Sequence, residues 1–377
     1  MKKQVLKTIK SSFLHELQNA YAGKKTSLPF ITHQLSLSPL VKENEIFEVL
    51  IIGGSVWKKA FLKKTKNGIE LIKKQTEQPV NLKNERDFLA FIENELPDEV
   101  TTLALNFAIP MEMVFENGRL DGIVLSVPKE GKLHGLIGKK VGAEIEKYIF
   151  EKQKRRIKAS VANDTVCLVL SGLTKYRWNQ FVAGIVGTGV NFAFFLKEEK
   201  IANLESANFD KFTLSQEARI IDKESREPNM HLFEKETAGA YLYKHFNIII
   251  KNENIKFKPI ASTEELSALC HPEFISGSKN KNRKKMLNQV QHDMVEVSEI
   301  AQDLLIRSAQ LVACQIAGIV SFMDRSMVFN MEGSLFWKGN NYKETVASTV
   351  GQLVPEHKVK FVEIENSAIL GATKLVS

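Results

Sequence analysis

The sequence predicts a two-domain α/β protein. Helical and strand-like segments alternate along its 377 residues, a length that accommodates two domains. Two similar strand–glycine–strand units occur far apart, one through Ile51-Ile52-Gly53-Gly54-Ser55 and one through Ile185-Val186-Gly187-Thr188-Gly189. Asn163-Asp164-Thr165 lies shortly before the second unit. The recurrence of this unit predicts two related halves that face a cleft.

Each glycine turn is predicted to form the tip of a β-hairpin. Strand-like runs flank the first turn at 47–52 and 56–62, and the second at 181–186 and 192–196. Glycine permits positive φ and lets an anion approach main-chain N–H groups, which is how backbone turns hold phosphates. An ordinary hairpin without a ligand is the alternative for either turn alone. Their recurrence favours phosphate binding, as in a two-domain kinase.

Composition is that of an ordinary globular protein, with 44% apolar and 25% charged residues. No uninterrupted apolar stretch approaches the ~20 residues of a membrane helix, and the N-terminal segment has no small-residue cleavage site. The net charge is +8, but the lysines are scattered and no aromatic platform is interleaved with them. We therefore expect a cytoplasmic protein without a membrane or nucleic-acid partner.

The three cysteines lie far apart at Cys167, Cys270 and Cys314. They lack pairing or zinc spacing, which predicts a reducing compartment and no protein-held metal. A metal site formed by Cys270, His271 and His292 is the alternative.

Periodicity predicts the remaining elements in order. The first helix carries an apolar stripe through Leu6, Ile9, Phe13 and Leu17. Further helices are predicted at 81–95, 143–156, 166–173, 232–246, 300–320 and 368–375, after the first at 4–21. Strands are predicted at 100–109, 157–162 and 361–364, a hairpin around 116–118, and a strand pair around 332–334.

Asp164 is predicted to lie just beyond the end of the strand 157–162, where a helix begins. In open α/β sheets, ligands bind beyond the carboxyl ends of the strands, so this position suits catalysis. The alternative is a helix N-cap, which Asn, Asp and Thr all favour.

Residues 270–294 interrupt a helical region with polar, basic sequence that has no periodicity. The segment resembles translated palindromic repeats that are inserted in some bacterial genes. We expect a disordered surface insertion without function, because long loops add little closure entropy.

The order and spacing of these motifs resemble the hexokinase family, within the actin-like, sugar-kinase and Hsp70 superfamily, and the chain is similar to a divergent bacterial-type member. The resemblance spans nearly the whole chain. Its segments are the first phosphate motif at 51–58, the catalytic-aspartate segment at 161–166, the second phosphate motif at 184–192, sugar-binding segments at 203–209 and 233–241, and the adenosine motif at 330–336.

The resemblance implies a two-domain actin-like (ribonuclease H-like) hexokinase fold with a cleft between a small and a large domain. Residues 1–45 would form a helical segment that packs on the large domain. Residues 46–160 would form the small domain and 161–377 the large one, with a C-terminal helix at 367–377 that returns to the small domain.

The resemblance also implies an activity, namely transfer of the γ-phosphoryl of ATP to the 6-hydroxyl of a hexose, with glucose the expected sugar, as the first step of glycolysis. A hydroxyl is a poor nucleophile at neutral pH, so a carboxylate must accept its proton, and Asp164 is the expected base. The implied substrate contacts are Lys129, Asn163, Asp164, Asn191, Glu205 and Glu234. The implied ATP contacts are Gly53, Gly54, Ser55, Gly187, Thr188, Gly189, Gly333 and Ser334. Hexose and ATP would be the only partners of a monomer or homodimer, with Mg²⁺ held mainly through the ATP phosphates.

Ile51 stands where the family has an aspartate that helps to organise Mg²⁺. An aliphatic side chain accepts no hydrogen bond from metal-bound water. Other departures from the family pattern are Val56, Lys58, Ala108, Pro128 and the pair Cys167-Leu168. They favour weak sugar binding, and they leave a second function open: a catalytically weak or inactive sugar-binding pseudokinase or sensor.

Overall fold

The structure is a computed structural model that describes residues 1–35, 39–53, 57–78, 80, 82–125, 127, 133–270 and 284–377, without the side chains of 284–293. The chain forms two compact units. Unit 1 consists of residues 1–30, 184–192 and 204–362, and unit 2 of residues 31–183, 193–203 and 363–377. The domain limits after residues 45 and 160 remain a prediction.

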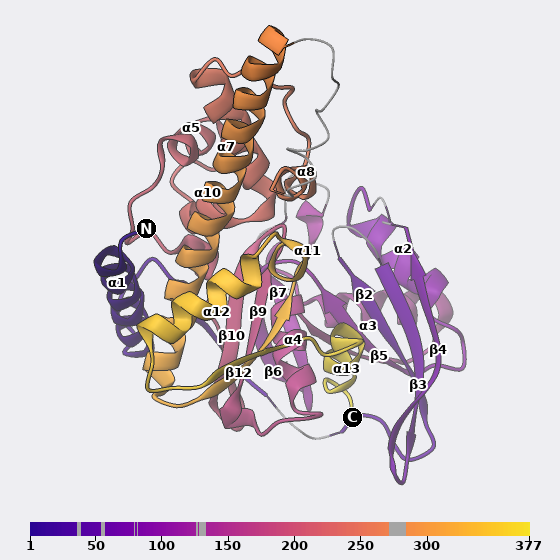
Figure 1. The fold of residues 1–377 in the computed structure, drawn as a ribbon. Helices are drawn as coiled ribbons and strands as arrows, with labels where there is room; N and C mark the ends of the chain where they lie inside the picture. Colours follow the sequence, from indigo (N-terminus) through magenta and orange to yellow (C-terminus); the bar gives the residue numbers. More distant parts are fainter. Residues whose placement is uncertain are drawn as a thin grey trace. The chain divides into compact units, whose positions relative to one another are not determined.

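Unit 1 is built around the long helix α10 (Lys284–Met323), with α1 (Lys3–Tyr21) and α12 (Tyr342–Leu353) packed along it (Figure 1). The helix predicted at 4–21 is therefore confirmed. Its apolar stripe is buried, and the Phe13 ring lies so close to α10 that a Cβ added at Gly318 would be 2.6 Å from Phe13 Cδ1. A small residue at this position lets the two helices approach closely.

Helix α10 is also long and apolar enough, over Met294–Met323, to cross a membrane, with a mean hydropathy of 1.5 in its most apolar window. However, 78% of that window is buried inside the protein. Burial against other protein elements explains an apolar helix without a bilayer. We assign α10 to the core of unit 1.

The other elements of unit 1 include helices at 216–224 and 263–268 that were not predicted, as α12 was not, and they differ from two further predictions. They are η3 (Ser206–Asn208), α5 (Gln216–Glu224), α6 (Leu232–Thr237), α7 (Gly239–Asn252), α8 (Thr263–Ala268), β12 (Met327–Glu332), α11 (Ser334–Lys338) and β13 (Val359–Val362). The helix predicted at 232–246 is two helices, because Ala238 between them is extended. The strand pair around 332–334 is wrong, since Gly333 (φ 118°) turns the chain from β12 into a helix.

The predicted insertion at 270–294 falls largely outside the described residues, which omit 271–283. From residue 284 onward the backbone belongs to helix α10 rather than to a loop.

Unit 2 contains a five-stranded sheet in the order β4-β3-β2-β5-β8. The strands are β2 (Ile46–Ile52), β3 (Trp57–Thr65), β4 (Gly68–Glu77), β5 (Thr102–Phe107) and β8 (Lys158–Ala162). Strand β5 is parallel to both β2 and β8, with Ile52 opposite Phe107 and Asn106 opposite Ala162. The carboxyl ends of these three strands therefore meet at one edge of the sheet.

Four helices accompany this sheet: α2 (Glu85–Glu95), α3 (Val141–Gln153), α4 (Asp164–Gly172) and α13 (Ser367–Thr373). Helix α13 packs on α4 and β2, as Figure 1 shows in yellow beside α4. A hairpin of β6 (Met111–Glu116) and β7 (Arg119–Val124) turns at Asn117-Gly118, where both residues have positive φ. The predicted hairpin at 116–118 is confirmed, and its turn residues are those that tolerate this conformation.

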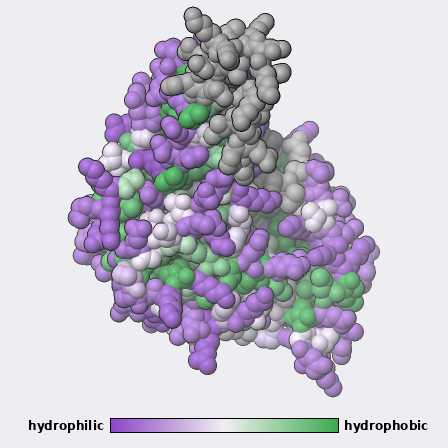
Figure 2. All heavy atoms as spheres, viewed as in Figure 1, coloured by the Kyte–Doolittle hydropathy of each residue, from purple (hydrophilic) through white to green (hydrophobic). Residues whose placement is uncertain are grey.

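Strand β4, which the sequence analysis did not predict, is an edge strand with exposed apolar side chains. Ile69, Leu71 and Ile72 are 36%, 43% and 51% exposed, and Figure 2 shows apolar surface over this edge of the sheet. Lys73 and Lys74 follow directly, and the register shifts between Phe61 and Leu62 of β3. Charged residues and an irregular register both oppose pairing with a further strand.

A six-stranded sheet has the order β1-β11-β10-β9-β12-β13. Its strands not yet named are β1 (Ile31–Gln34), β9 (Phe181–Val186), β10 (Val190–Lys197) and β11 (Lys200–Asn203). The turn between β9 and β10 is the second predicted glycine turn, so this hairpin is confirmed. The limits of the two units fall within β9 and β10.

His33 in β1 is fully buried, and neither ring nitrogen has a hydrogen-bond partner among the described residues. Burial lowers the pKa of His33 to about 4. The folded protein therefore keeps this imidazole neutral at a pH where the unfolded chain protonates it.

We predict that His33 makes the protein lose stability as the pH falls from about 6.5 towards 4, because only the unfolded chain then binds the proton. Between pH 7 and 5 the loss should be about 2 kcal/mol. Urea unfolding of the wild type and of His33→Leu at both pH values measures it as the difference between their pH dependences. Equal pH dependence in the two proteins would contradict the assignment.

Candidate active site

In unit 2, the carboxyl edge of the sheet presents Gly53 after β2 and Asn163-Asp164 after β8. Asn163 is the N-cap of α4, because its Oδ1 accepts a hydrogen bond from Val166 N at 2.8 Å. The capping role considered for this segment thus belongs to Asn163. Asp164 is the first residue of the helix.

The Asp164 carboxylate is only partly exposed. Its Oδ1 accepts hydrogen bonds from Thr165 N at 2.8 Å and from Thr165 Oγ1 at 3.3 Å. Burial raises the pKa of Asp164, and the hydrogen bonds from Thr165 offset part of that rise. A carboxylate of raised proton affinity at a strand end is suited to accept a proton from a substrate.

Ile51 lies near the same edge, paired across the sheet with Lys58 of β3 and Asn106 of β5. Asn106 is buried, and its Oδ1 has no hydrogen-bond partner among the described residues. The site predicted from the sequence does not include this amide. A single polar residue within the apolar run of β5 is the signal that could have identified it.

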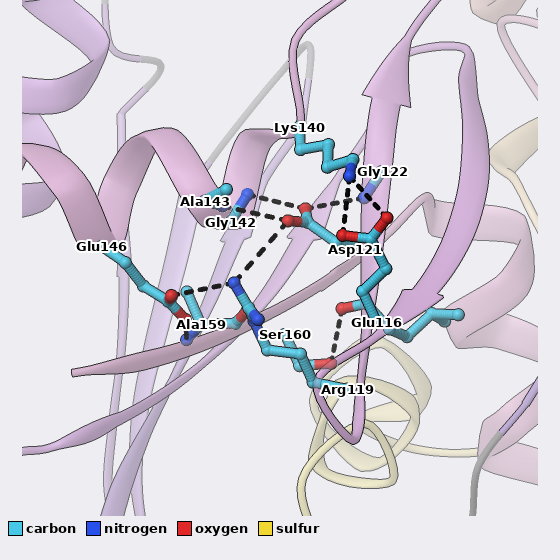
Figure 3. Close-up of polar contacts among 11 residues, drawn as sticks. Glu116, Arg119, Asp121, Gly122, Lys140, Gly142, Ala143, Glu146, Ala159 and Ser160 are labelled. Atoms are coloured by element: carbon cyan, nitrogen blue, oxygen red, sulfur yellow. Dashed lines mark hydrogen bonds and ion pairs between the residues drawn. The ribbon is translucent and has the colours of Figure 1, made fainter.

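A largely buried charge network joins β7, α3 and β8 next to this edge (Figure 3). The Arg119 Nη2 atom is 2.8 Å from Glu146 Oε2 and 4.0 Å from Asp121 Oδ2, and Arg119 Nε donates to the Ala159 carbonyl at 2.8 Å. Burial raises the pKa of both Asp121 and Glu146, whereas the guanidinium lowers them. The cation thus offsets part of the cost of burying Asp121 and of partly burying Glu146.

The same network joins three elements of unit 2. Asp121 on β7 accepts hydrogen bonds from Gly142 N at 2.7 Å and Ala143 N at 3.0 Å, in the first turn of α3. Ser160 Oγ on β8 donates to the Leu120 carbonyl at 2.9 Å. The network therefore fixes the strand that ends immediately before Asn163 and Asp164.

Helix α4 also packs closely against α13, the last helix of the chain. A Cβ added at Gly371 would collide with the carbonyl oxygen of Cys167, so the two helices approach closely only with glycine there. Cys167 and Leu168, which depart from the family pattern, are buried in this contact region.

In unit 1, the second glycine turn lies against two other backbone segments. Gly239 N donates to the Gly187 carbonyl at 2.7 Å, and Ala240 N donates to the Thr188 carbonyl at 3.3 Å. A Cβ at Gly239 would be 2.8 Å from Gly187 O, and one at Gly333 would collide with the Val186 carbonyl. Larger residues at these positions would separate the three segments.

A cavity of 170 Å³ lies where these segments meet, entirely within unit 1. Its lining includes the predicted ATP contacts Gly187, Thr188 and Ser334, and adds Gly239 and Lys338. Hydroxyls, main-chain N–H groups and Lys338 are donors suited to phosphate oxygens. The Glu264 carboxylate also lines the cavity, and its Oε1 accepts a hydrogen bond from Ser334 Oγ at 3.5 Å.

The predicted sugar contacts of unit 1 gather close to the same turn. The Glu234 Oε2 atom accepts a hydrogen bond from Val190 N at 3.3 Å, and a Cβ added at Gly189 would be 2.6 Å from this oxygen. Asn191 Nδ2 is 3.5 Å from Glu205 Oε1. Three of the predicted side chains are thereby brought together with the glycine turn.

Glu205 has a left-handed backbone, with φ 50°. This conformation is uncommon for a residue with a Cβ and occurs preferentially at functional sites. Asn191 Oδ1 accepts a hydrogen bond from Ser206 N at 3.2 Å, and Gln315 Nε2 donates to the Ser206 carbonyl at 3.1 Å. The backbone beside Glu205 is thus fixed by Asn191 on one side and by α10 on the other.

The family model for hexokinase matches residues 181–376, which is more than half of the chain. The chain belongs to the hexokinase family. The match begins at β9 and includes the second glycine turn, Glu205, Glu234 and the segment through Ser334.

Individual members of the hexokinase family are similar at low identity. Hexokinase-1 of Solanum tuberosum is 24% identical over 326 residues, which is 74% of this chain and 64% of that protein. Hexokinase of Emericella nidulans is 24% identical over 99% of this chain and 87% of its own length. The alignment thus spans less than two thirds of the potato protein.

A solved structure of hexokinase from Schistosoma mansoni complexed with glucose superimposes with a TM-score of 0.78 at 19% identity. The superposition covers 99% of this chain and 96% of that one. This likeness confirms the predicted α/β class and the two-domain actin-like hexokinase fold.

Several predicted positions of this hexokinase-family chain lie outside the described residues, namely Gly54, Ser55 and Lys129. His271 of the alternative metal set also lies outside them, as does the side chain of His292. Where the chain is described, no group of three or more His, Cys, Asp or Glu side chains gathers as a metal site.

Tyr241 is a further polar neighbour that the predicted site omits. Burial and the nearby Glu234 carboxylate raise the pKa of Tyr241, so its phenol stays protonated at neutral pH. A protonated phenol near a carboxylate can donate a hydrogen bond to a ligand that binds there.

We predict that Arg119→Met lowers the free energy of unfolding by about 2–4 kcal/mol, because the buried Asp121 and the partly buried Glu146 then lose their cation. Lys140→Met is the matched control, since Lys140 pairs with Glu116 at 2.6 Å on the exposed side of the same hairpin. That loss should stay below about 1 kcal/mol. Urea unfolding compares the two variants, and losses of equal size would contradict a special role for Arg119.

Proposed function

We propose that this chain is an ATP-dependent hexokinase that transfers the γ-phosphoryl of ATP to the 6-hydroxyl of a hexose, with glucose as the preferred sugar. The observation that carries the proposal is the gathering of Asn191, Glu205 and Glu234 beside the glycine turn Gly187–Gly189. A polar cluster for a sugar thus lies next to a turn suited to phosphate, within one unit.

The polar cluster matches the chemistry of a hexose. Each sugar hydroxyl both donates and accepts hydrogen bonds, so carboxylates and amides are better partners than apolar walls. Glu205 and Glu234 supply acceptors, and the Asn191 amide supplies a donor near Glu205. The backbone beside Glu205 is fixed by the hydrogen bonds from Ser206 N to Asn191 Oδ1 and from Gln315 Nε2 to the Ser206 carbonyl.

Asp164 is the proposed general base. Its carboxylate accepts the proton of the 6-hydroxyl as that oxygen bonds to the γ-phosphorus of ATP, and the bond from phosphorus to the β,γ-bridging oxygen breaks to release ADP. Its raised pKa strengthens it as a proton acceptor. Asn163, which caps α4, and the Arg119 network orient the segment that carries the base.

Magnesium ion, when bound with ATP, supplies charge neutralisation on the phosphates. In this proposal the ATP phosphates hold most of the ion, because Ile51 offers it no acceptor. Backbone and hydroxyl groups at Gly187, Thr188 and Ser334 would hold the nucleotide.

Ile51 favours a second candidate function, a sugar-binding pseudokinase or sensor that binds glucose without transferring phosphoryl. The two functions differ in one measurement, ATP consumption at saturating glucose. The kinase proposal also includes a role in the first step of glycolysis and a cytoplasmic location. It includes a monomeric or homodimeric state.

We predict that Asp164→Asn lowers kcat by at least ~10²-fold, the usual scale for loss of a general base. The coupled formation of NADPH from glucose 6-phosphate measures the rate, and urea unfolding shows that the fold is retained. Asp98→Asn, an exposed carboxylate of the same unit, is the control and should keep wild-type activity. A fully active, folded Asp164→Asn protein would exclude Asp164 as the base.

We predict that Ile51→Asp raises kcat/KM by about 10- to 100-fold at limiting Mg²⁺, the scale typical of an outer-shell metal partner. The gain should shrink as the Mg²⁺ concentration increases. Ile46→Asp, at the exposed start of the same strand, adds the same charge and should give no gain. If both variants fold and neither gains activity, Ile51 is not what limits turnover.

A further inference from the structure

Unit 1 contains a larger cavity away from the glycine turn, of 840 Å³. It lies between the first turns of α1, the loop 211–215 and Arg307 on α10. This volume is within the range of small-molecule sites, which are mostly apolar with a few placed polar groups.

The cavity wall is apolar on one side and cationic on the other. Val5, Ile9, Phe212 and Leu214 supply apolar surface, and Val5 is 45% exposed. Lys2, Lys211 and Arg307 supply cations, whereas no carboxylate is among the described residues that line the cavity. Such a wall is complementary to an anion with an apolar body.

The cations differ in their availability to a ligand. Lys211 pairs with Asp210 at 2.7 Å, but both side chains are substantially exposed, and exposed pairs contribute little. Lys211 can therefore exchange this partner for a ligand. Arg307 is anchored more firmly, because its Nε is 2.6 Å from the buried Glu236 Oε1.

A neighbouring hollow of 720 Å³ shares Thr8 and Lys211 with the cavity. Its remaining lining residues are all polar: Gln4, Lys7, Ser11, Ser12, His15 and Glu16. An apolar hollow beside a polar one, with a lysine common to both, suits a molecule that has an apolar tail and an ionised head.

From this arrangement we infer that the cavity between α1 and the loop 211–215 is a binding site for a small amphipathic carboxylate. The apolar tail lies against Ile9, Phe212 and Leu214. The carboxylate lies at Lys211, which lines both the cavity and the polar hollow.

Residues that line this site contact helix α6, which carries Glu234. Phe212 contacts Phe233 with ring centroids 5.4 Å apart, and Ser215 N donates to Glu236 Oε2 at 2.8 Å. The wall residues thus touch α6 on both sides of Glu234. If the proposed hexose binding by Glu234 holds, the carboxylate and the sugar are coupled, and each changes the affinity of the other by the same factor.

Calorimetry of the full chain with octanoate tests the site, with octanol as the neutral comparator. We expect saturable binding of octanoate at millimolar concentration and at least about tenfold weaker binding of octanol, because the cations act only on the ionised head. Absence of saturable octanoate binding, or equal binding of the two probes, would overturn the inference.

Charge-reversal variants locate the binding. Lys211→Glu and Leu214→Glu should each weaken octanoate binding at least about tenfold, since each places a carboxylate on the wall. Lys3→Glu is the matched control, because Lys3 is an exposed residue of α1 next to Lys2 and does not line the cavity. Equal loss in all three variants would show nonspecific attraction to a basic surface and contradict the site.

Glucose calorimetry with and without octanoate tests the coupling separately. A shift of about fivefold or more in glucose affinity is expected, at the lower limit of typical coupling. If glucose does not bind while octanoate does, the hexokinase proposal fails and the carboxylate site stands. If both bind without a shift, the coupling through α6 is wrong.

Discussion

Close backbone contact at three glycines is the constraint on which the candidate site of unit 1 depends. Gly187, Gly239 and Gly333 lie where three chain segments meet, and a Cβ at Gly239 or Gly333 would strike a carbonyl oxygen of the second turn. The contact fixes the turn that precedes Asn191 and places Glu234 beside Gly189. Nucleotide and sugar contacts therefore follow from the same packing, and a change at any of these glycines would displace both.

Unit 2 positions the Asp164 carboxylate in a different way, through a charge network that is centred on Arg119. Arg119 is shared between Asp121 and Glu146, and the network ties β7, α3 and the strand that precedes Asp164. Buried ion pairs add little net stability, but loss of one partner is costly. The network thus acts mainly to specify where the strand lies. A strand held in this way presents the base in one position, which proton transfer requires.

The sequence was sufficient for the fold class, for most helices and strands and for the family, because apolar periodicity and glycine turns are local signals. It did not predict the break at Ala238 or the helix after Gly333, since both depend on contacts with distant segments. The cluster of Asn191, Glu205 and Glu234 could be proposed only from the resemblance, as their spacing alone has no periodicity. Asn106 and Tyr241 were missed because their significance depends on burial, which a single sequence does not reveal.

Phosphorus NMR of the wild-type chain with ATP, Mg²⁺ and glucose tests the central claim most directly. The account predicts that a glucose 6-phosphate signal grows in step with ADP, and that both require glucose. Unchanged ATP in the presence of glucose that calorimetry shows to be bound would contradict the account and indicate a sensor. Release of inorganic phosphate without sugar phosphate would contradict it as well, because the nucleotide would then be hydrolysed rather than used to phosphorylate a hexose.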